Sequence, residues 1–292
     1  MIGTTYSHTH IQSLHLSHED AFRDLLEFKF DVVRLGCYWN EIQPDSKTFN
    51  FKPMISMLEE CEKRNQQVVM TVGMKAPRWP EFYVPSWVRG ETPADWLEHC
   101  LLYLERTIRT LKKFSCITHW QVENEPLDPS GPKQLSIPLP LLKKEIYCVR
   151  SLDNKKIIST LWGNELTKRG EYEHMLPYVD AVGIDLYYKV PFGPWFYTGP
   201  RDSDTALKKL IATSPKPLWI MELQAEPWEH KEVVTKKREP RSINHNLLAE
   251  NFERAKALHP KAILLWGYEY WYMKKMQGDE RMWNAAKQLT FI

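Results

Sequence analysis

Residues 116–126 read CITHWQVENEP, and they give the strongest indication of the fold class. Its first seven residues are mostly apolar or β-branched, which is typical of a short buried strand. The strand ends in a cluster of acidic and amide side chains before a proline. Amphipathic stretches at 94–113 and 138–151 lie on either side and predict helices. A strand between two helices is the repeating unit of a parallel α/β sheet.

The same strand–helix unit recurs along the whole chain. Strands are predicted at 1–6, 31–36, 67–73, 116–122, 156–161, 179–185, 217–222 and 261–266. Helices are predicted at 18–29, 54–65, 94–113, 138–151, 170–176, 203–213, 241–258 and 280–289. A doubly wound sheet has an open edge and usually about five to seven strands, so this order favours a (β/α)8 TIM barrel. We therefore predict one α/β domain over residues 1–292.

Charge and hydropathy exclude two classes of partner. Lys and Arg total 39 against 37 for Asp and Glu, so the chain lacks the basic surplus that favours nucleic-acid binding. Apolar stretches such as 262–267 are much shorter than the roughly 18 to 20 residues that a membrane span requires. The sequence thus predicts neither a nucleic-acid partner nor a membrane span.

The cysteines and the first residues indicate a compartment. Five widely spaced cysteines without a CxxC pair predict free thiols packed as small hydrophobic side chains. The sequence as written has no secretion signal after Met1, which predicts a cytoplasmic location. A secreted or anchored protein is expected instead if a signal or anchor precedes Met1 in the natural chain.

Two carboxylates stand at the ends of predicted strands. Glu125 follows strand 116–122, and Glu222 ends strand 217–222. The carboxyl ends of barrel strands open on one face, where such barrels carry their chemistry. The long connections expected on that face are 74–93, 123–137, 186–202 and 223–240. Two carboxylates that flank one bond provide the nucleophile and the proton donor of glycoside hydrolysis.

With these residues the chain resembles clan A of the glycoside hydrolases, retaining barrel enzymes with Asn-Glu-Pro on the fourth strand and a nucleophilic Glu on the seventh. The resemblance covers the whole chain and implies that Glu125 is the acid/base and Glu222 the nucleophile. It also implies that Arg34 keeps the nucleophile ionised, Asn124 binds the sugar 2-hydroxyl, Tyr187 hydrogen-bonds the nucleophile and Trp266 forms the floor of the sugar subsite.

Within the clan, the chain most resembles cellulase-like members that carry Arg-Trp-Pro after the third strand, here residues 78–80. Tyr188 competes with Tyr187 for the tyrosine role. Strand alternation predicts that Glu123 turns the same way as Glu125. The tryptophans that follow strands are predicted to project into the mouth of the barrel and stack on sugar; they are Trp39, Trp79, Trp195, Trp228 and Trp271.

His8 and His10 follow the first strand and resemble the start of a metal-dependent amidohydrolase barrel. That class needs further ligands: a Lys on the fourth strand, His on the fifth and sixth, and Asp on the eighth. Here the fourth strand offers Glu, the fifth has no His and the eighth ends in Trp. The sequence therefore predicts no metal site and favours a sugar-binding or structural role for His8.

The predicted function is a retaining β-glycoside hydrolase that cleaves O-glycosidic bonds of β-linked oligo- or polysaccharides by double displacement. It would need a carbohydrate substrate and neither a metal nor an organic cofactor. Retention requires carboxyl groups about 5 to 5.5 Å apart, and Arg34 is expected nearer to Glu222 than to Glu125. The alternatives are a transglycosylase that uses the same covalent intermediate and a non-catalytic carbohydrate-binding barrel.

Overall fold

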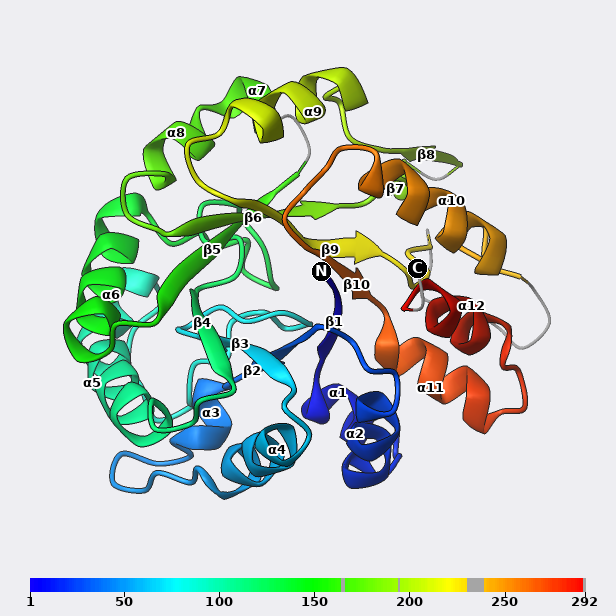
Figure 1. Cartoon of the computed structure of the whole chain (residues 1–292). Helices are drawn as coiled ribbons and strands as arrows, with labels where there is room; N and C mark the ends of the chain where they lie inside the picture. Colours follow the sequence, from blue (N-terminus) through cyan, green and yellow to red (C-terminus); the bar gives the residue numbers. More distant parts are fainter. Residues whose placement is uncertain (164–165, 194, 230–238, 291–292) are drawn as a thin grey trace. The chain divides into compact units, whose positions relative to one another are not determined.

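The computed structural model describes residues 1–163, 166–193, 195–229 and 239–290. Its long parallel strands form a closed barrel in the order β1-β10-β9-β6-β5-β4-β3-β2 (Figure 1). These strands are β1 (Ile2–Tyr6), β2 (Val32–Gly36), β3 (Gln67–Val72), β4 (Ile117–Val122), β5 (Lys156–Trp162), β6 (Ala181–Leu186), β9 (Leu218–Gln224) and β10 (Ile263–Trp266). The predicted TIM barrel is confirmed, and each predicted strand overlaps an observed one.

The eight predicted helices are present with shifted ends. They are α2 (His18–Leu26), α4 (Lys52–Lys63), α5 (Pro93–Leu111), α6 (Leu139–Leu152), α8 (Glu171–Met175), α9 (Asp204–Thr213), α10 (His245–Lys256) and α12 (Arg281–Leu289). Further short elements lie in the connections: α1 (His8–Ser13), α3 (Trp39–Ile42), α7 (Leu166–Arg169), α11 (Tyr268–Met276), β7 (Val190–Phe192) and β8 (Phe196–Thr198). These segments are too short or too uniformly aromatic to show a clear helical or strand period.

The chain divides into two compact units. Unit 1 comprises residues 1–32, 162–169 and 184–292, and unit 2 comprises 33–161 and 170–183. Within unit 1, β10 pairs in parallel with β1 and β9. Within unit 2, β4 pairs in parallel with β3 and β5. The prediction of one domain over 1–292 stays a prediction.

Helices α5 and α6 lie side by side in unit 2 (Figure 1). Thr92 precedes helix α5 in a capping box, in which Asp95 accepts hydrogen bonds from the backbone before the helix. The buried face of α5 carries apolar side chains such as Leu104 and Ile108, each of which stabilises the fold by roughly 1.5–3 kcal/mol when fully buried. The same face carries Cys100, and the buried face of α6 carries Glu145.

All five cysteines are free thiols, as predicted. Cys37, Cys61, Cys100 and Cys116 are buried, and Cys148 is half-buried. Burial raises the pKa of the Cys37 thiol to about 12, so this side chain stays neutral and packs as a small hydrophobic group.

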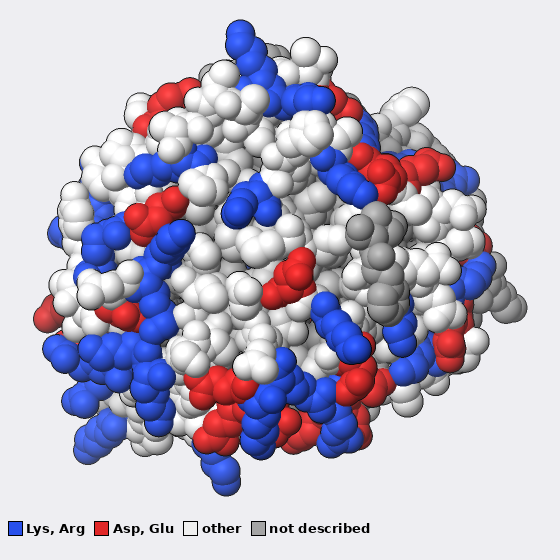
Figure 2. All heavy atoms as spheres, viewed as in Figure 1, with Lys and Arg blue, Asp and Glu red and all other residues white. Residues whose placement is uncertain are grey.

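No helix in the described ranges is both long and apolar enough to cross a membrane. Lys and Arg side chains and Asp and Glu side chains both occur on the face shown in Figure 2, which agrees with the near balance of 39 basic and 37 acidic residues.

Candidate active site

The end of β4 forms a strained turn in unit 2. Glu123 and Glu125 have φ angles of 61° and 42°, in the left-handed region that side chains other than glycine rarely adopt. The backbone N–H of Asn124 donates to the Lys75 carbonyl at 2.9 Å. The N–H of Glu125 donates to the Thr160 hydroxyl at 2.7 Å. Such conformations cost about 1–3 kcal/mol each and cluster at functional sites.

The side chain of Asn124 is fixed by three donors. Its Oδ1 accepts hydrogen bonds from Gln121 Nε2 at 3.1 Å, Thr160 Oγ1 at 3.1 Å and Arg34 Nη1 at 3.4 Å. All four side chains are buried. Because the donors converge on the amide oxygen, the amide nitrogen remains as the donor that Asn124 offers to a ligand.

Lys75 holds the backbone that follows β4. This fully buried side chain donates from Nζ to the Glu125 carbonyl at 2.7 Å and to the Asp128 carbonyl at 3.1 Å. The Glu81 carboxylate lies 3.5 Å from the same ammonium group. Lys75 and Thr160 were not among the residues expected from the sequence. Their positions at strand ends were visible there, but their contacts with the Glu125 backbone were not.

Trp79 projects from the loop after β3 with 70% of its surface exposed. The Tyr83 hydroxyl donates to the carbonyls of Arg78 and Trp79, each at 3.2 Å. The Tyr83 ring packs against Tyr38 with the ring centroids 4.3 Å apart. The backbone below Trp79 is thus anchored while its ring is open to solvent.

Glu222 lies near the end of β9 in unit 1, with 4% of its surface exposed. The hydroxyl of Tyr187, which follows β6, donates to Glu222 Oε2 at 2.5 Å. Tyr188 packs elsewhere, with its ring 4.1 Å from the Arg254 guanidinium carbon. Gln224 accepts from the Lys189 N–H and donates to the Lys189 carbonyl, both at 2.8 Å, which ties β9 to the segment that carries Tyr187.

An aromatic cluster in unit 1 is formed by Trp162, Tyr187, Trp228 and Trp266, and its Tyr187 hydroxyl contacts Glu222. The Trp162 ring stacks on Tyr187 with centroids 5.3 Å apart, and Trp228 meets Tyr187 edge-on at 5.4 Å. Trp266 is almost buried, whereas Trp228 is 46% exposed. Trp162 was not expected from the sequence. It is the last residue of β5, where a strand-end aromatic could have indicated it.

The prediction of sugar stacking is wrong for two of the tryptophans. Trp39 has no exposed surface; its indole N–H donates to Gln43 and its ring stacks on Tyr103. Trp271 is equally buried, with its N–H donating to the Ala225 carbonyl at 2.7 Å. Neither ring presents a face to a sugar. A position directly after a strand does not show whether a tryptophan is exposed or buried. Trp39 and Trp271 each lie in a short helix that turns the ring into the core.

Trp195 and the histidines after the first strand are the remaining predicted residues. Trp195 is 78% exposed, next to Pro194, which lies outside the described residues. The connection 223–240 is described only to residue 229 and from 239.

His8 is buried, with its ring centroid 6.1 Å from that of His18. Over the described ranges, the group of three potential metal ligands that lie together is Cys100, Glu123 and Glu145, and it includes neither His8 nor His10.

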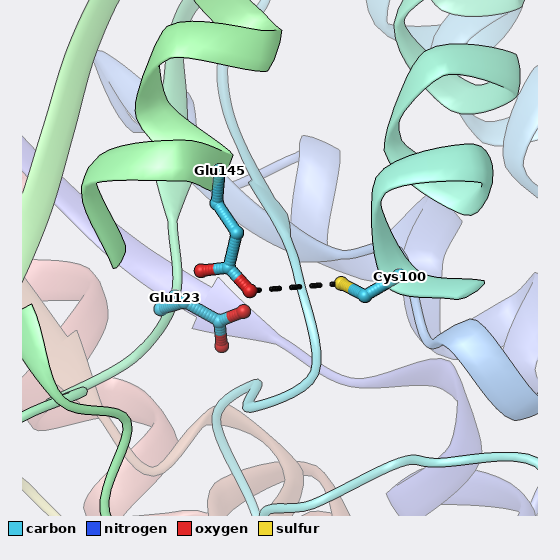
Figure 3. Close-up of side chains that lie close together, drawn as sticks. All are labelled: Cys100, Glu123 and Glu145. Atoms are coloured by element: carbon cyan, nitrogen blue, oxygen red, sulfur yellow. Dashed lines mark hydrogen bonds between the residues drawn. The ribbon is translucent and has the colours of Figure 1, made fainter. Parts of the chain in front are cut away.

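Glu123 is fully buried, and its carboxylate lies beside Cys100 of α5 and Glu145 of α6 (Figure 3). Both Glu123 and Glu125 have positive φ angles, so the regular alternation of a strand does not extend over this turn. The expectation that the two side chains turn the same way stays a prediction.

No protein-family model and no curated protein matches this sequence. Solved structures match the fold of this chain. GH5_18 from Streptomyces cattleya in complex with GlcNAc matches at 14% identity and a TM-score of 0.64, over 91% of this chain and 69% of that one. A glycosylated family 10 endo-β-1,4-xylanase from Gloeophyllum trabeum matches at 13% identity and 0.66, over 100% and 96%.

A β-galactosidase from the haloarchaeon Halorubrum lacusprofundi matches at 14% identity and a TM-score of 0.65, over 99% of this chain and 57% of that one. The chain shares the fold of these glycosidases. The resemblance to clan A barrels is therefore confirmed at the level of the fold, while the roles of Glu125 and Glu222 and the distance between them stay predictions.

Proposed function

We propose that this protein is a retaining β-glycoside hydrolase that cleaves O-glycosidic bonds of β-linked oligo- or polysaccharides. The observation that carries the proposal is the 2.5 Å hydrogen bond from Tyr187 to Glu222 near the end of a barrel strand. This bond orients a nearly buried carboxylate by one oxygen, which is what an attacking nucleophile requires. The shared fold with glycosidases supports the same class.

The reaction proceeds by two displacements. Glu222 attacks the anomeric carbon as the bond to the leaving oxygen breaks, and Glu125 gives that oxygen its proton. The product of this step is a glycosyl ester of Glu222. Glu125, now ionised, takes a proton from water, and the resulting hydroxide equivalent attacks the anomeric carbon and releases Glu222. Protons and electron pairs balance over the cycle, with no other reactant.

The surrounding residues fit a sugar. The Asn124 amide nitrogen is available to donate to the 2-hydroxyl, because Gln121, Thr160 and Arg34 all donate to its oxygen. A hydrogen bond to the 2-hydroxyl strengthens in the transition state and contributes to catalysis. In the same proposal, the exposed face of Trp228 stacks on the C–H face of the sugar, while Trp266 forms the floor of its subsite.

The test is intact-protein mass spectrometry after incubation with activated 2-deoxy-2-fluoro β-glycosides of the gluco, manno and galacto series. The wild-type protein is expected to gain the mass of one fluorosugar with at least one reagent. Glu222→Gln is expected to gain none, because an amide is not a nucleophile. Glu226→Gln, an acid four residues further along the same segment, is the matched control and should label like the wild type.

Labelling of Glu222→Gln at the wild-type rate would refute the nucleophile assignment. Folded wild-type protein that takes up no reagent from the three series and cleaves none of the parent glycosides would refute the proposed activity. The reagent that labels fastest would identify the preferred glycone.

A further inference from the structure

Three buried polar side chains lie together behind the turn that carries Glu125, and the proposed chemistry uses none of them. They are Cys100 of α5, Glu123 at the end of β4 and Glu145 of α6, and none has exposed surface (Figure 3). Their ligand atoms all lie within 4.8 Å of one another. Two buried carboxyl groups at this distance cannot both be ionised without a large free-energy cost.

Glu123 fits the place of the ionised partner. Its two oxygens each accept a backbone hydrogen bond at 2.6 Å, one from the N–H of Met74 and one from the N–H of Lys75. If either oxygen carried a proton, its O–H group would face an N–H donor. The two backbone hydrogen bonds therefore favour the ionised carboxylate. Gly73 leaves the space for it: with a φ of 125°, a Cβ at this residue would lie 2.1 Å from Glu123 Oε1.

Glu145 fits the place of the neutral partner. Burial and the neighbouring Glu123 raise the pKa of Glu145 well above its usual value. Burial also raises the pKa of Glu123, to about 7, but the N–H groups of Met74 and Lys75 and the positive charge of Lys75 oppose this rise and favour the ionised form. From α5, the thiol of Cys100 donates to Glu145 Oε1 at 3.7 Å (Figure 3). A side-chain hydrogen bond to Glu123 raises the pKa of Glu145 further, which fits a protonated Glu145 that donates this hydrogen bond to Glu123.

Lys75 links Glu123 to the turn that carries Glu125. The backbone N–H of Lys75 donates to Glu123, its backbone carbonyl accepts from Asn124, and its ammonium group donates to the Glu125 carbonyl. Whatever fixes Lys75 therefore fixes the two residues that follow Glu123. The same contacts offset the cost of the left-handed conformations at Glu123 and Glu125.

We propose that Glu123 and Glu145 form a positioning pair, a carboxylate hydrogen-bonded by a neutral carboxylic acid, which holds Lys75 and through it the turn that presents Asn124 and Glu125. The role in catalysis rests on the proposed hydrolase function. The pair itself does not touch substrate, so it acts on the reaction only through the position of Glu125.

Two amide substitutions separate this arrangement from general packing. In Glu145→Gln the new amide still donates to Glu123, so the turn is retained and kcat/KM stays within about twofold of the wild type. In Glu123→Gln one oxygen becomes an NH2 group that faces a backbone N–H, and that N–H loses its acceptor. We expect kcat for unactivated glycosides to fall by about tenfold or more, with little change in KM. Glu98→Gln, on the exposed face of α5, is the control.

Two readouts do not depend on activity. Hydrogen exchange of the backbone at residues 123–128 should be faster in Glu123→Gln and unchanged in Glu145→Gln and Glu98→Gln, because only the first substitution releases the turn. At neutral pH, Glu145→Gln should lose one infrared carbonyl band of a protonated carboxylic acid that the wild type and Glu98→Gln both show. A second such band, from the protonated Glu125 of the proposed mechanism, should be the same in all three proteins. The band of Glu145 remains measurable even if Glu123→Gln does not fold.

The proposal is overturned if the protonated-carboxyl absorption of Glu145→Gln is the same as that of the wild type, or if Glu145→Gln loosens the turn as much as Glu123→Gln. Stoichiometric zinc in the wild type that is lost in Cys100→Ala would also overturn it, because metal binding needs both carboxyl groups ionised. A protein that cleaves no glycoside but shows the expected band and exchange pattern would contradict only the hydrolase function and leave the positioning pair in place.

Discussion

Tyr187 and Tyr188 are adjacent in the sequence and chemically identical, yet the structure gives them different neighbours. The Tyr187 hydroxyl donates to Glu222, whereas the Tyr188 ring lies against Arg254. The Tyr188 hydroxyl is buried and meets no hydrogen-bond partner in the described parts of the chain. Only the first of the two can orient the proposed nucleophile.

A matched pair of substitutions tests this difference. Tyr187→Phe removes a hydrogen bond to a charged group, worth about 1.5–3 kcal/mol, so kcat/KM should fall by about 10- to 100-fold. Tyr188→Phe should leave kcat/KM nearly unchanged, because its hydroxyl contacts no catalytic group. Steady-state kinetics on the substrate identified by labelling would measure both. Equal losses in the two variants would contradict the assigned role of Tyr187.

At the scale of elements, two tryptophans that follow neighbouring strands have opposite surroundings. Helix α3 turns the Trp39 ring into the core of unit 2, where it stacks on Tyr103. The loop after β3 instead presents Trp79 to solvent on an anchored backbone. The sequence showed both as aromatic residues after a strand, and the conformation of each connection decides which one is accessible.

Trp39→Ala and Trp79→Ala should therefore affect different quantities. Removal of the buried Trp39 ring leaves a cavity and should lower the free energy of unfolding by about 3–5 kcal/mol. Trp79→Ala should change it by about 0.5 kcal/mol or less, and should raise KM if Trp79 stacks on sugar. Denaturant unfolding and steady-state kinetics measure the two effects. A large loss of stability in Trp79→Ala would show that this ring packs against the protein.

At the scale of the whole molecule, the buried proton of Glu145 predicts how stability depends on pH. The pKa of Glu145 is raised in the folded protein by burial and by Glu123. Above the unfolded-state pKa of about 4.3, Glu145 holds a proton in the folded protein that it has lost in the unfolded chain. The contribution of Glu145 to the free energy of unfolding therefore decreases as pH rises, until pH passes its folded-state pKa.

Glu145→Gln removes this dependence because the amide does not titrate. The stability of Glu145→Gln relative to the wild type should increase with pH above about 4.3, by at most about 1.4 kcal/mol per pH unit. Denaturant unfolding at several pH values would measure the difference, and Glu98→Gln should track the wild type throughout. A stability difference between Glu145→Gln and the wild type that does not change with pH would show that Glu145 is already ionised in the folded protein.

Local sequence patterns were enough to predict the barrel and the candidate carboxylates. Periodicity is local: a strand buried on both faces or a helix with one apolar face is written in successive residues, so the strands and main helices could be predicted. The placement of Glu125 and Glu222 at strand ends follows from the same pattern. The hydrogen bond between Tyr187 and Glu222 was expected only through the resemblance, and the structure shows this contact.

Which side chains meet depends on how the helices and strands pack in three dimensions. Cys100, Glu123 and Glu145 belong to α5, the end of β4 and α6, and their contact depends on how those helices pack against the strand. The left-handed φ at Glu123 lies outside the strand region, so strand alternation does not describe this residue. Trp39 is buried because helix α3 packs its ring into the core of unit 2. Long-range packing and single backbone torsions leave no period in the sequence, so the burial of Trp39 and Trp271 could not be predicted from it.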